Sequence, residues 1–274
     1  MTLTVATSLS ALPEYRRVLF TLVARDLKVK YQTKALGFLW SLLHPALMIS
    51  IWYVVFNRVL KIDMPHYWAF LIVGMLPFQF VQNAIHEGAG AVRRNASLIR
   101  KIYMPMEILV IAGVTVKLIE FLAQLAVAVL LLAIAHRGSG MPGEVFGLAP
   151  LKALVVLPTA VLLLYLFVLG IALPLSAWTV VYRDLEHMVT LGLMMLFYLT
   201  PIFWSLSMIG DSRWRWMFLV NPLVSFIELF RAPLYWGGWP AMLTWGLAGG
   251  AAMIAFIAGY ALFDRSKHVL AEVV

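Results

Sequence analysis

Six long apolar stretches constrain this chain more than any other feature of its sequence. A helix needs about 20 apolar residues to cross the ~30 Å hydrocarbon layer of a membrane, where backbone must satisfy its own hydrogen bonds. Only 12% of the 274 residues are charged, against roughly 25% in soluble domains, which favours an all-α membrane protein. We expect six transmembrane helices, at residues 37–57, 67–86, 107–135, 152–181, 188–204 and 239–263.

The first 36 residues form a separate segment that holds six Lys and Arg. Apolar side chains recur there on one side of a helix. This stripe consists of Tyr15, Val18, Leu19, Leu22, Val23 and Val29. The pattern predicts an amphipathic interface helix within residues 1–36 on the cytoplasmic membrane surface; a solvated basic tail is the alternative. Residues 37–274 then form a single transmembrane domain.

The basic residues predict which side of the membrane the termini occupy. With six spans both termini share a side, and connections rich in Lys and Arg favour the cytoplasm. Thirteen Lys and Arg fall on the side of the termini and seven on the opposite side. We therefore expect both termini in the cytoplasm.

The stretch between the fifth and sixth predicted spans is apolar but interrupted. Pro222, Pro233 and Gly237, with the charges of Glu228 and Arg231, divide it into pieces too short to cross a membrane. We expect a re-entrant or interfacial helical hairpin at residues 217–237. Glu228 and Arg231 should lie near the outer surface and, three residues apart, can pair.

The run RRNASLIRKIYMP, residues 93–105, is unusually polar for its position between the second and third spans. Asn95 can cap a helix of about two turns that ends before Pro105. Its apolar side is Leu98, Ile99 and Ile102, and its cationic rim is Arg94, Arg100 and Lys101. This pattern fits either a lipid anchor or a docking helix for a cytoplasmic protein. A short linker between spans four and five would face the same partner through Arg183, Asp184 and Glu186.

Lys117 and Glu120 are ionisable residues one turn apart within the third span. Pairing lowers the cost of charge at membrane depth, and ionisable residues inside membranes are functional candidates. A structural salt bridge, a polar wall of a pathway and proton coupling remain open for this pair. Proton coupling would make the chain a secondary transporter, although the sequence lacks the internal repeat that many of them have.

Metal and nucleotide chemistry have little support in the sequence. The chain has no cysteine, and its six histidines lack metal-ligand spacing, so we expect no metal. No G-x-x-x-x-G-K-[ST] loop occurs and no soluble stretch could fold around a nucleotide, so another chain must hydrolyse any ATP that is used. A membrane enzyme acting on lipid-linked sugar is also disfavoured, because the acidic residues are dispersed along the chain and form no catalytic cluster.

Four segments together resemble a known family: RDLKVKYQTKALGFLWSLLHP (25–45), RRNASLIRKIYMP (93–105), YRDLEHMVTL with LTPIFW (182–204) and NPLVSFIELFRAPLYWG (221–237). In order and spacing they look like the membrane subunits of type-2 ABC exporters for polysaccharides, which include O-antigen, capsule and teichoic-acid permeases. The resemblance implies a homodimer in the bacterial cytoplasmic (inner) membrane, with two separate ATPase subunits that hold ATP and Mg and no nucleic-acid partner. It also implies that residues 95–103 are a coupling helix that docks on the ATPase.

The implied cargo is a lipid-linked polysaccharide. O-antigen on an undecaprenyl carrier is the leading candidate, and capsule and teichoic acid are alternatives. A polymer pathway needs flat faces that do not hold the cargo too tightly. Aromatic candidates, for which packing between helices or against lipid is the alternative, are Trp40, Trp52, Tyr53, Phe56, Phe78, Phe80, Tyr198, Phe203 and Trp204.

Two further groups of residues are assigned to the ends of this pathway. Basic residues at the cytoplasmic entrance could receive a pyrophosphate. They are Arg25, Lys28, Lys30 and Lys34. We hypothesise that the hairpin closes the pathway when no cargo is present, with the gate residues Phe226, Glu228, Phe230 and Arg231.

Overall fold

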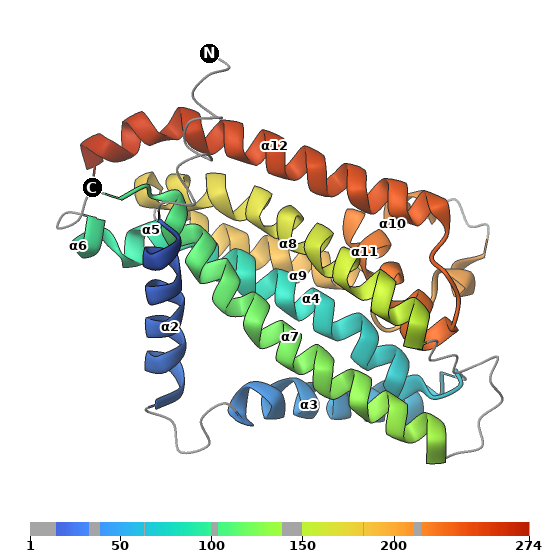
Figure 1. The fold of residues 1–274 in the computed structure, drawn as a ribbon. Helices are drawn as coiled ribbons and strands as arrows, with labels where there is room; N and C mark the ends of the chain where they lie inside the picture. Colours follow the sequence, from blue (N-terminus) through green and yellow to red (C-terminus); the bar gives the residue numbers. More distant parts are fainter. Residues whose placement is uncertain are drawn as a thin grey trace.

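The computed structural model describes residues 15–32, 39–62, 64–99, 104–138, 150–182, 184–210 and 215–273. The regular elements within these ranges are all helices (Figure 1). Five helices are long and apolar enough to cross a membrane: Leu39–Val59, Tyr67–Ala89, Glu107–Ala135, Leu151–Val181 and Met242–Ser266. The expected all-helical membrane architecture is confirmed at this level.

Figure 1 shows how the helices are arranged. In chain order they are α2 (Arg16–Gln32), α3 (Leu39–Tyr53), η1 (Val54–Val59), α4 (Tyr67–Ala89), α5 (Ala91–Arg94), α6 (Ala96–Ile99), α7 (Glu107–Gly138), α8 (Pro150–Val181), α9 (Leu185–Leu199), η2 (Leu206–Ile209), α10 (Arg215–Leu219), α11 (Pro222–Arg231), η3 (Ala232–Trp236) and α12 (Met242–Val273). The long helices α4, α7, α8 and α12 form a bundle, and α3 runs along one side of it. Helix α2 lies across one end, where the carboxyl end of α12 is also found.

The span predicted at 188–204 is shorter in the structure. Helix α9 has 15 residues, which rise about 22 Å, less than the ~30 Å hydrocarbon layer. The helix ends because Thr200 is extended, with ψ of 128°, as expected for a residue that precedes a proline. The described part of the chain therefore has five full-length spans and one shorter apolar helix.

Helices α8 and α12 approach closely at a pair of glycines. A Cβ added to Gly259 would lie 1.7 Å from the backbone oxygen of Gly170, and one added to Gly170 would lie 2.3 Å from the carbonyl carbon of Ala255. Ala248 and Ala252 are fully buried on the same side of α12. Small residues let helix backbones pack together in a membrane, where apolar contact with lipid is as favourable as contact with protein.

The apolar stripe of α2 packs on the protein itself. Leu22 and Val23 are buried in a cluster with residues at the start of α7, and Tyr15, Val18 and Leu19 pack against the same cluster. Val29, expected in the stripe, is 66% exposed. The reason is that α2 crosses α7 rather than running along it, so only part of the stripe is covered (Figure 1).

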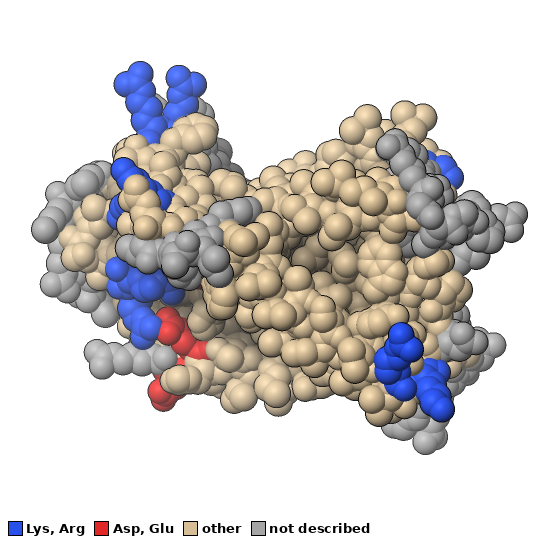
Figure 2. Space-filling view, turned by 90° about the horizontal axis from the view of Figure 1, so that it is seen from below, with Lys and Arg blue, Asp and Glu red and all other residues tan. Residues whose placement is uncertain are grey.

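Charged side chains gather at the two ends of the bundle. On the face drawn in Figure 2, Lys and Arg lie at both ends and Asp and Glu at one, and a wide band without charge separates them. A protein embedded in ~30 Å of hydrocarbon presents such a band to lipid.

Candidate functional site

Five charged side chains join four helices at the end of the bundle where α2 lies. The Lys30 ammonium lies 2.5 Å from the Glu120 carboxylate on α7, and the Lys117 ammonium lies 3.6 Å from the same carboxylate. Lys117 also lies 3.6 Å from Glu87 on α4, which in turn pairs with Arg94 on α5. The expected Lys117–Glu120 pair is confirmed, but it is part of this larger group, which we call the charge network.

The network holds the last turn of α2 partly inside the protein. Burial lowers the pKa of Lys30, and the hydrogen bond to Glu120 opposes this effect. Burial, with Glu120 as a second cause, raises the pKa of Tyr31. A solvated tail would have neither the Lys30–Glu120 contact nor the buried Leu22 and Val23, so the alternative of a free basic segment does not describe α2.

Two polar cavities flank the charge network. The larger, about 580 Å³, lies among α2, α4, α5, α6 and α7 and is lined by Arg25 as well as by Lys30 and Lys117. The smaller, about 200 Å³, shares these two lysines and is also lined by Trp40. Two of the predicted entrance residues, Arg25 and Lys30, therefore line cavities. Lys28 is exposed, and Lys34 lies outside the described residues.

The predicted coupling helix is described only in its first half. Helices α5 and α6 have four residues each, with Asn95 between them. The Asn95 side chain donates to the Ala91 carbonyl and accepts from Arg25 at 3.1 Å, so it ties the loop to α2 instead of capping α6. Leu98 and Ile99 are half-buried against the α2–α7 cluster. Arg100, Lys101 and Ile102 lie outside the described residues.

The two loops expected to face one partner lie side by side. Arg93 of α5 forms an ion pair with Glu186 in the first turn of α9. The Thr179 hydroxyl near the end of α8 donates to the Ala89 carbonyl of α4 at 2.6 Å. Asp184, two residues before Glu186, is exposed, and Arg183 lies outside the described residues. The loops therefore form one surface at the same end of the bundle as α2.

Aromatic rings from α3, η1, α4 and α9 form one cluster that includes Phe203, in the segment after α9. The Phe203 ring centroid lies 4.6 Å from that of Trp52 and 4.7 Å from that of Phe56. Phe197 of α9 lies 5.2 Å from both Phe203 and Phe78. The structure thus brings four of the predicted pathway residues, Trp52, Phe56, Phe78 and Phe203, into one cluster that also contains Phe197.

Phe197 was not among the predicted pathway residues. Leu193 and Thr200, four residues before it and three after it, are both buried. Helical periodicity therefore places Phe197 on the inner side of α9. The sequence carries no such signal, because residues 191–199, LGLMMLFYL, are apolar on every side of the helix.

Burial separates the predicted pathway residues into groups. Trp40 and Tyr198 are 47% and 61% exposed. Four are half-buried: Trp52, Tyr53, Phe56 and Trp204. Three belong to the core and present no face to a polymer in this conformation: Phe78, Phe80 and Phe203. In the structure these three rings are packed between helices, which was the alternative to a place in the pathway.

Arg231, at the end of α11, is fully buried. Its guanidinium donates to the carbonyls of Pro201 and Ile202, each at 2.8 Å, and lies 3.3 Å from the Glu228 carboxylate. The Phe70 ring lies against it, with 3.7 Å from Cζ to the ring centroid. These carbonyls belong to the non-helical segment after α9, and irregular backbone at membrane depth is tolerated only where protein satisfies it.

Neighbouring residues complete this site. A Cβ on Gly74 would lie 2.6 Å from Nη2 of Arg231, so α4 leaves room for the guanidinium. Asn221 caps α11 by accepting from the Leu223 N–H at 3.0 Å, and its Nδ2 donates to the Thr200 hydroxyl at 2.9 Å. Helix α11 is therefore tied at both ends to the segment that follows α9. We call this arrangement the Arg231 site.

The segment of the predicted hairpin consists of short helices in the structure. As expected, the segment is divided into short helices, α10 and α11, of five and ten residues, and Gly237 ends η3 with φ of 68°. The Glu228–Arg231 pair is also confirmed. Arg231 is enclosed together with Phe226 and Phe230 among residues of the core. Glu228 is half-buried.

Comparison with known proteins adds what geometry alone does not decide. The family described as ABC-2 type transporter matches residues 17–235. This chain belongs to the ABC-2 type transporter family. The match begins in α2 and ends in η3, so it includes the charge network, both loops and the Arg231 site. As an ABC-2 transporter chain with five long apolar helices, it is a multi-pass protein of the inner membrane.

Relatives within this family cover almost the whole chain. The O-antigen export system permease protein RfbA of Klebsiella pneumoniae is 30% identical over 257 residues, which are 93% of this chain and 94% of that protein. The protein of the same name from Myxococcus xanthus is 29% identical over 260 residues, 94% and 96% of the two chains. The polysialic acid transport protein KpsM of Escherichia coli is 25% identical over 253 residues, 91% and 93% of the two chains.

Proposed function

We propose that this chain is the membrane subunit of an ATP-driven exporter that moves a lipid-linked polysaccharide out of the cytoplasm. O-antigen on an undecaprenyl carrier is the proposed cargo, since relatives at 29% and 30% identity are O-antigen export permeases. A capsular polysaccharide is the second candidate, supported by the relative at 25% identity that transports polysialic acid. Teichoic acid is a third candidate cargo, supported only by the family resemblance of the four segments quoted above.

The observation that carries this proposal is the surface formed by the two joined loops. Arg93 and Glu186 hold the loop after α4 against the loop before α9. A homodimer would present two such surfaces, and each would dock one ATPase subunit that binds ATP and Mg. Arg94 and Asn95 contact Glu87 on α4 and Arg25 on α2, so movement of a docked ATPase would reach both helices.

The topology follows from the same proposal. Helix α9 and the segment after it make the fifth of six crossings, both termini are cytoplasmic, and residues 217–237 are a re-entrant gate. In support, α2 and the carboxyl end of α12 lie at one end of the bundle. In addition, Arg231 donates hydrogen bonds to the Pro201 and Ile202 carbonyls of the segment that continues from α9. Because Phe226 and Phe230 are buried, opening this gate would require α11 itself to move.

The face formed by α3 and α9 is the proposed contact between the two copies. These helices meet at the aromatic cluster, where Trp52 lies 6.2 Å from Phe197. They also expose large apolar side chains: Leu47, Met48, Ile51, Met188, Leu191, Met194, Met195 and Tyr198. A pathway between two such faces would be lined by Tyr198 and by the half-buried rings of α3.

The secondary-transporter alternative relies on the Lys117–Glu120 pair. Both residues also contact further charged residues, Glu87 and Lys30. A network shared with α2 and α5 is better placed to join the interface helix to the coupling loop.

Co-purification tests the proposal. The chain is isolated in detergent from its native host, and bound protein and ATPase activity are measured. We expect an ATPase subunit in equal amount, and its loss when Leu98, Ile99 and Ile102 are replaced by serine. A matched control replaces Val59 and Leu60, 69% and 59% exposed beyond the other end of α3, by serine and should keep the subunit. A wild-type chain that purifies alone and without ATPase activity would overturn the proposal.

A further inference from the structure

Three cavities follow one another along α7. The larger polar cavity reaches Lys117, the smaller one extends from Lys117 to Gln124, and an apolar cavity of about 460 Å³ extends from Gln124 to Leu131. Antiparallel α4 supplies lining residues in the matching order: Glu87, then Asn83 and Gln79, then Leu76, Ile72 and Trp68. Neighbouring cavities share residues, and the 14 positions from Lys117 to Leu131 rise about 21 Å. We call the three together the furrow.

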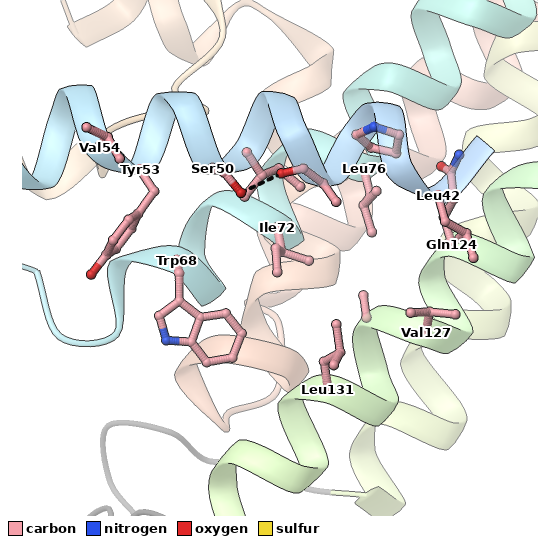
Figure 3. A pocket seen from close by; sticks show the side chains of 14 residues that line it. Leu42, Ser50, Tyr53, Val54, Trp68, Ile72, Leu76, Gln124, Val127 and Leu131 are labelled. Carbon is pink, nitrogen blue, oxygen red and sulfur yellow. Dashed lines mark hydrogen bonds between the residues drawn. The ribbon is translucent and has the colours of Figure 1, made fainter. Parts of the chain in front are cut away.

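The apolar part of the furrow lies between α3 and the helices α4 and α7. Figure 3 shows Ile72, Leu76, Val127 and Leu131 facing this space across from α3. Only Pro45 and Ile49 of α3 are buried, whereas most of α4 is. The cavity is lined mainly by apolar side chains from α3, α4 and α7, so a hydrocarbon chain suits it. Its volume lies within the range of about 300–1,000 Å³ that is usual for ligand sites.

The small middle cavity has a different chemistry. Lys30 and Lys117 supply cationic donors there, and each ammonium has three N–H groups, so it can bind a phosphate oxygen while keeping a carboxylate partner. The cavity is also lined by the Glu120 carboxylate, the shared partner of both lysines, and by amide, hydroxyl and aromatic groups: Tyr31, Trp40, Ser41, Gln79, Asn83 and Gln124. Beyond the lysines, the larger polar cavity adds Asn95 and Ser97, whose donors and acceptors suit a sugar ring.

We propose that the furrow holds the lipid carrier of the cargo. The hydrocarbon tail lies between α3 and the pair α4 and α7, the phosphate lies beside Lys30 and Lys117, and the first sugar lies beyond these lysines in the larger polar cavity, beside Asn95 and Ser97. This inference rests on the proposed function, which requires a lipid-linked saccharide, and it adds the place where that lipid is held. The order of chemistry along the furrow, apolar then cationic and polar, matches the order of groups in such a molecule.

Photo-crosslinking in cells that make the cargo tests the inference on the whole exporter. A benzoylphenylalanine in place of Ile72 reports on the furrow, and one in place of Met253, 50% exposed on α12, serves as control. We expect adducts at Ile72 whose mass corresponds to hydrocarbon, phosphate and sugar, and only phospholipid adducts at Met253. Phospholipid adducts alone at Ile72, no adduct there, or the same saccharide lipid at both positions would overturn the inference.

Two sets of variants give an independent readout. Replacing both Lys30 and Lys117 by methionine should reduce the saccharide-lipid adduct by at least about tenfold, the effect of losing one or more charge-assisted contacts. Ala128→Phe fills the apolar cavity that Ala128 lines and should stop export, whereas Leu130→Phe, 59% exposed on the same helix, should not. If Ala128→Phe exports at the wild-type rate while the ATPase still co-purifies, the inference alone fails. If no ATPase binds the unmodified chain, the proposed function fails and the inference with it.

Discussion

Arg231 and Lys117 are both cations in a largely apolar chain, and their surroundings differ. Arg231 is fully buried, and its donors bind two backbone carbonyls and one carboxylate. The Lys117 side chain is 13% exposed, lies between two carboxylates at 3.6 Å and lines two cavities. The first arrangement satisfies backbone carbonyls at the break that follows α9. The second consists of charges that share partners and can accept another, so we assign structure to the Arg231 site and ligand or partner contacts to the charge network.

The largest effect that this comparison predicts is that of Arg231→Met. It leaves the Pro201 and Ile202 carbonyls and Glu228 without their donor, and breaking a buried ion pair costs about 3–5 kcal/mol. Unfolding of the purified protein in detergent should show this loss, whereas Arg58→Met, at an exposed position, should leave the transition unchanged. An unaltered transition for Arg231→Met would mean that the guanidinium does not hold the segment after α9.

A smaller loss of stability is expected for Gly74→Ala, because Gly74 lies on α4 against the Arg231 guanidinium. The added Cβ would lie 2.6 Å from Nη2 of Arg231, and overpacking of this kind costs about 1–3 kcal/mol. The matched control is Gly246→Ala on α12, where a Cβ meets nothing within 4 Å. If both variants unfold alike, the close approach of α4 to the guanidinium is not a constraint.

Substitutions in the charge network should change the free energy of unfolding less than substitutions at the Arg231 site. Glu87→Gln removes the anionic partner of Lys117 and Arg94, but the Glu87 side chain is 36% exposed, and pairs of this kind contribute about 0–1 kcal/mol. We expect little change in unfolding and a clear fall in export or in the ATPase activity of the complex. A loss of stability as large as that of Arg231→Met would remove the distinction between the two groups of charges.

The smallest effect is predicted for the contact between the two loops. Arg93→Glu and Glu186→Arg should each weaken co-purification of the ATPase, and the double variant should restore part of it because the pair is re-formed in reverse. The coupling energy from such a cycle should be about 0.2–1 kcal/mol, as for other exposed ion pairs. Purely additive single effects would show that the pair does not join the loops in solution.

The five long helices could be predicted from apolar length alone. Five predicted spans coincide with helices to within a few residues, since about 20 apolar residues in a row have few other stable solutions. The end of α9 was misplaced because the residues after Thr200 are as apolar as those before it, and only the Thr200–Pro201 step marks the change. The pairs Lys117–Glu120 and Glu228–Arg231 were also predictable, because residues three apart on a helix are neighbours.

What the sequence determined by itself is local: an all-helical membrane chain, its spans, an amphipathic first helix and two short-range ion pairs. Contacts between distant segments were decided only by the tertiary structure. Lys30 reaches Glu120, Arg93 reaches Glu186, and Arg231 reaches carbonyls about 30 positions earlier in the chain. The physical reason is that helical periodicity relates residues only within a few positions, whereas the partner of a buried charge depends on which helices cross. The furrow, the joined loops and the Arg231 site all arise from such crossings.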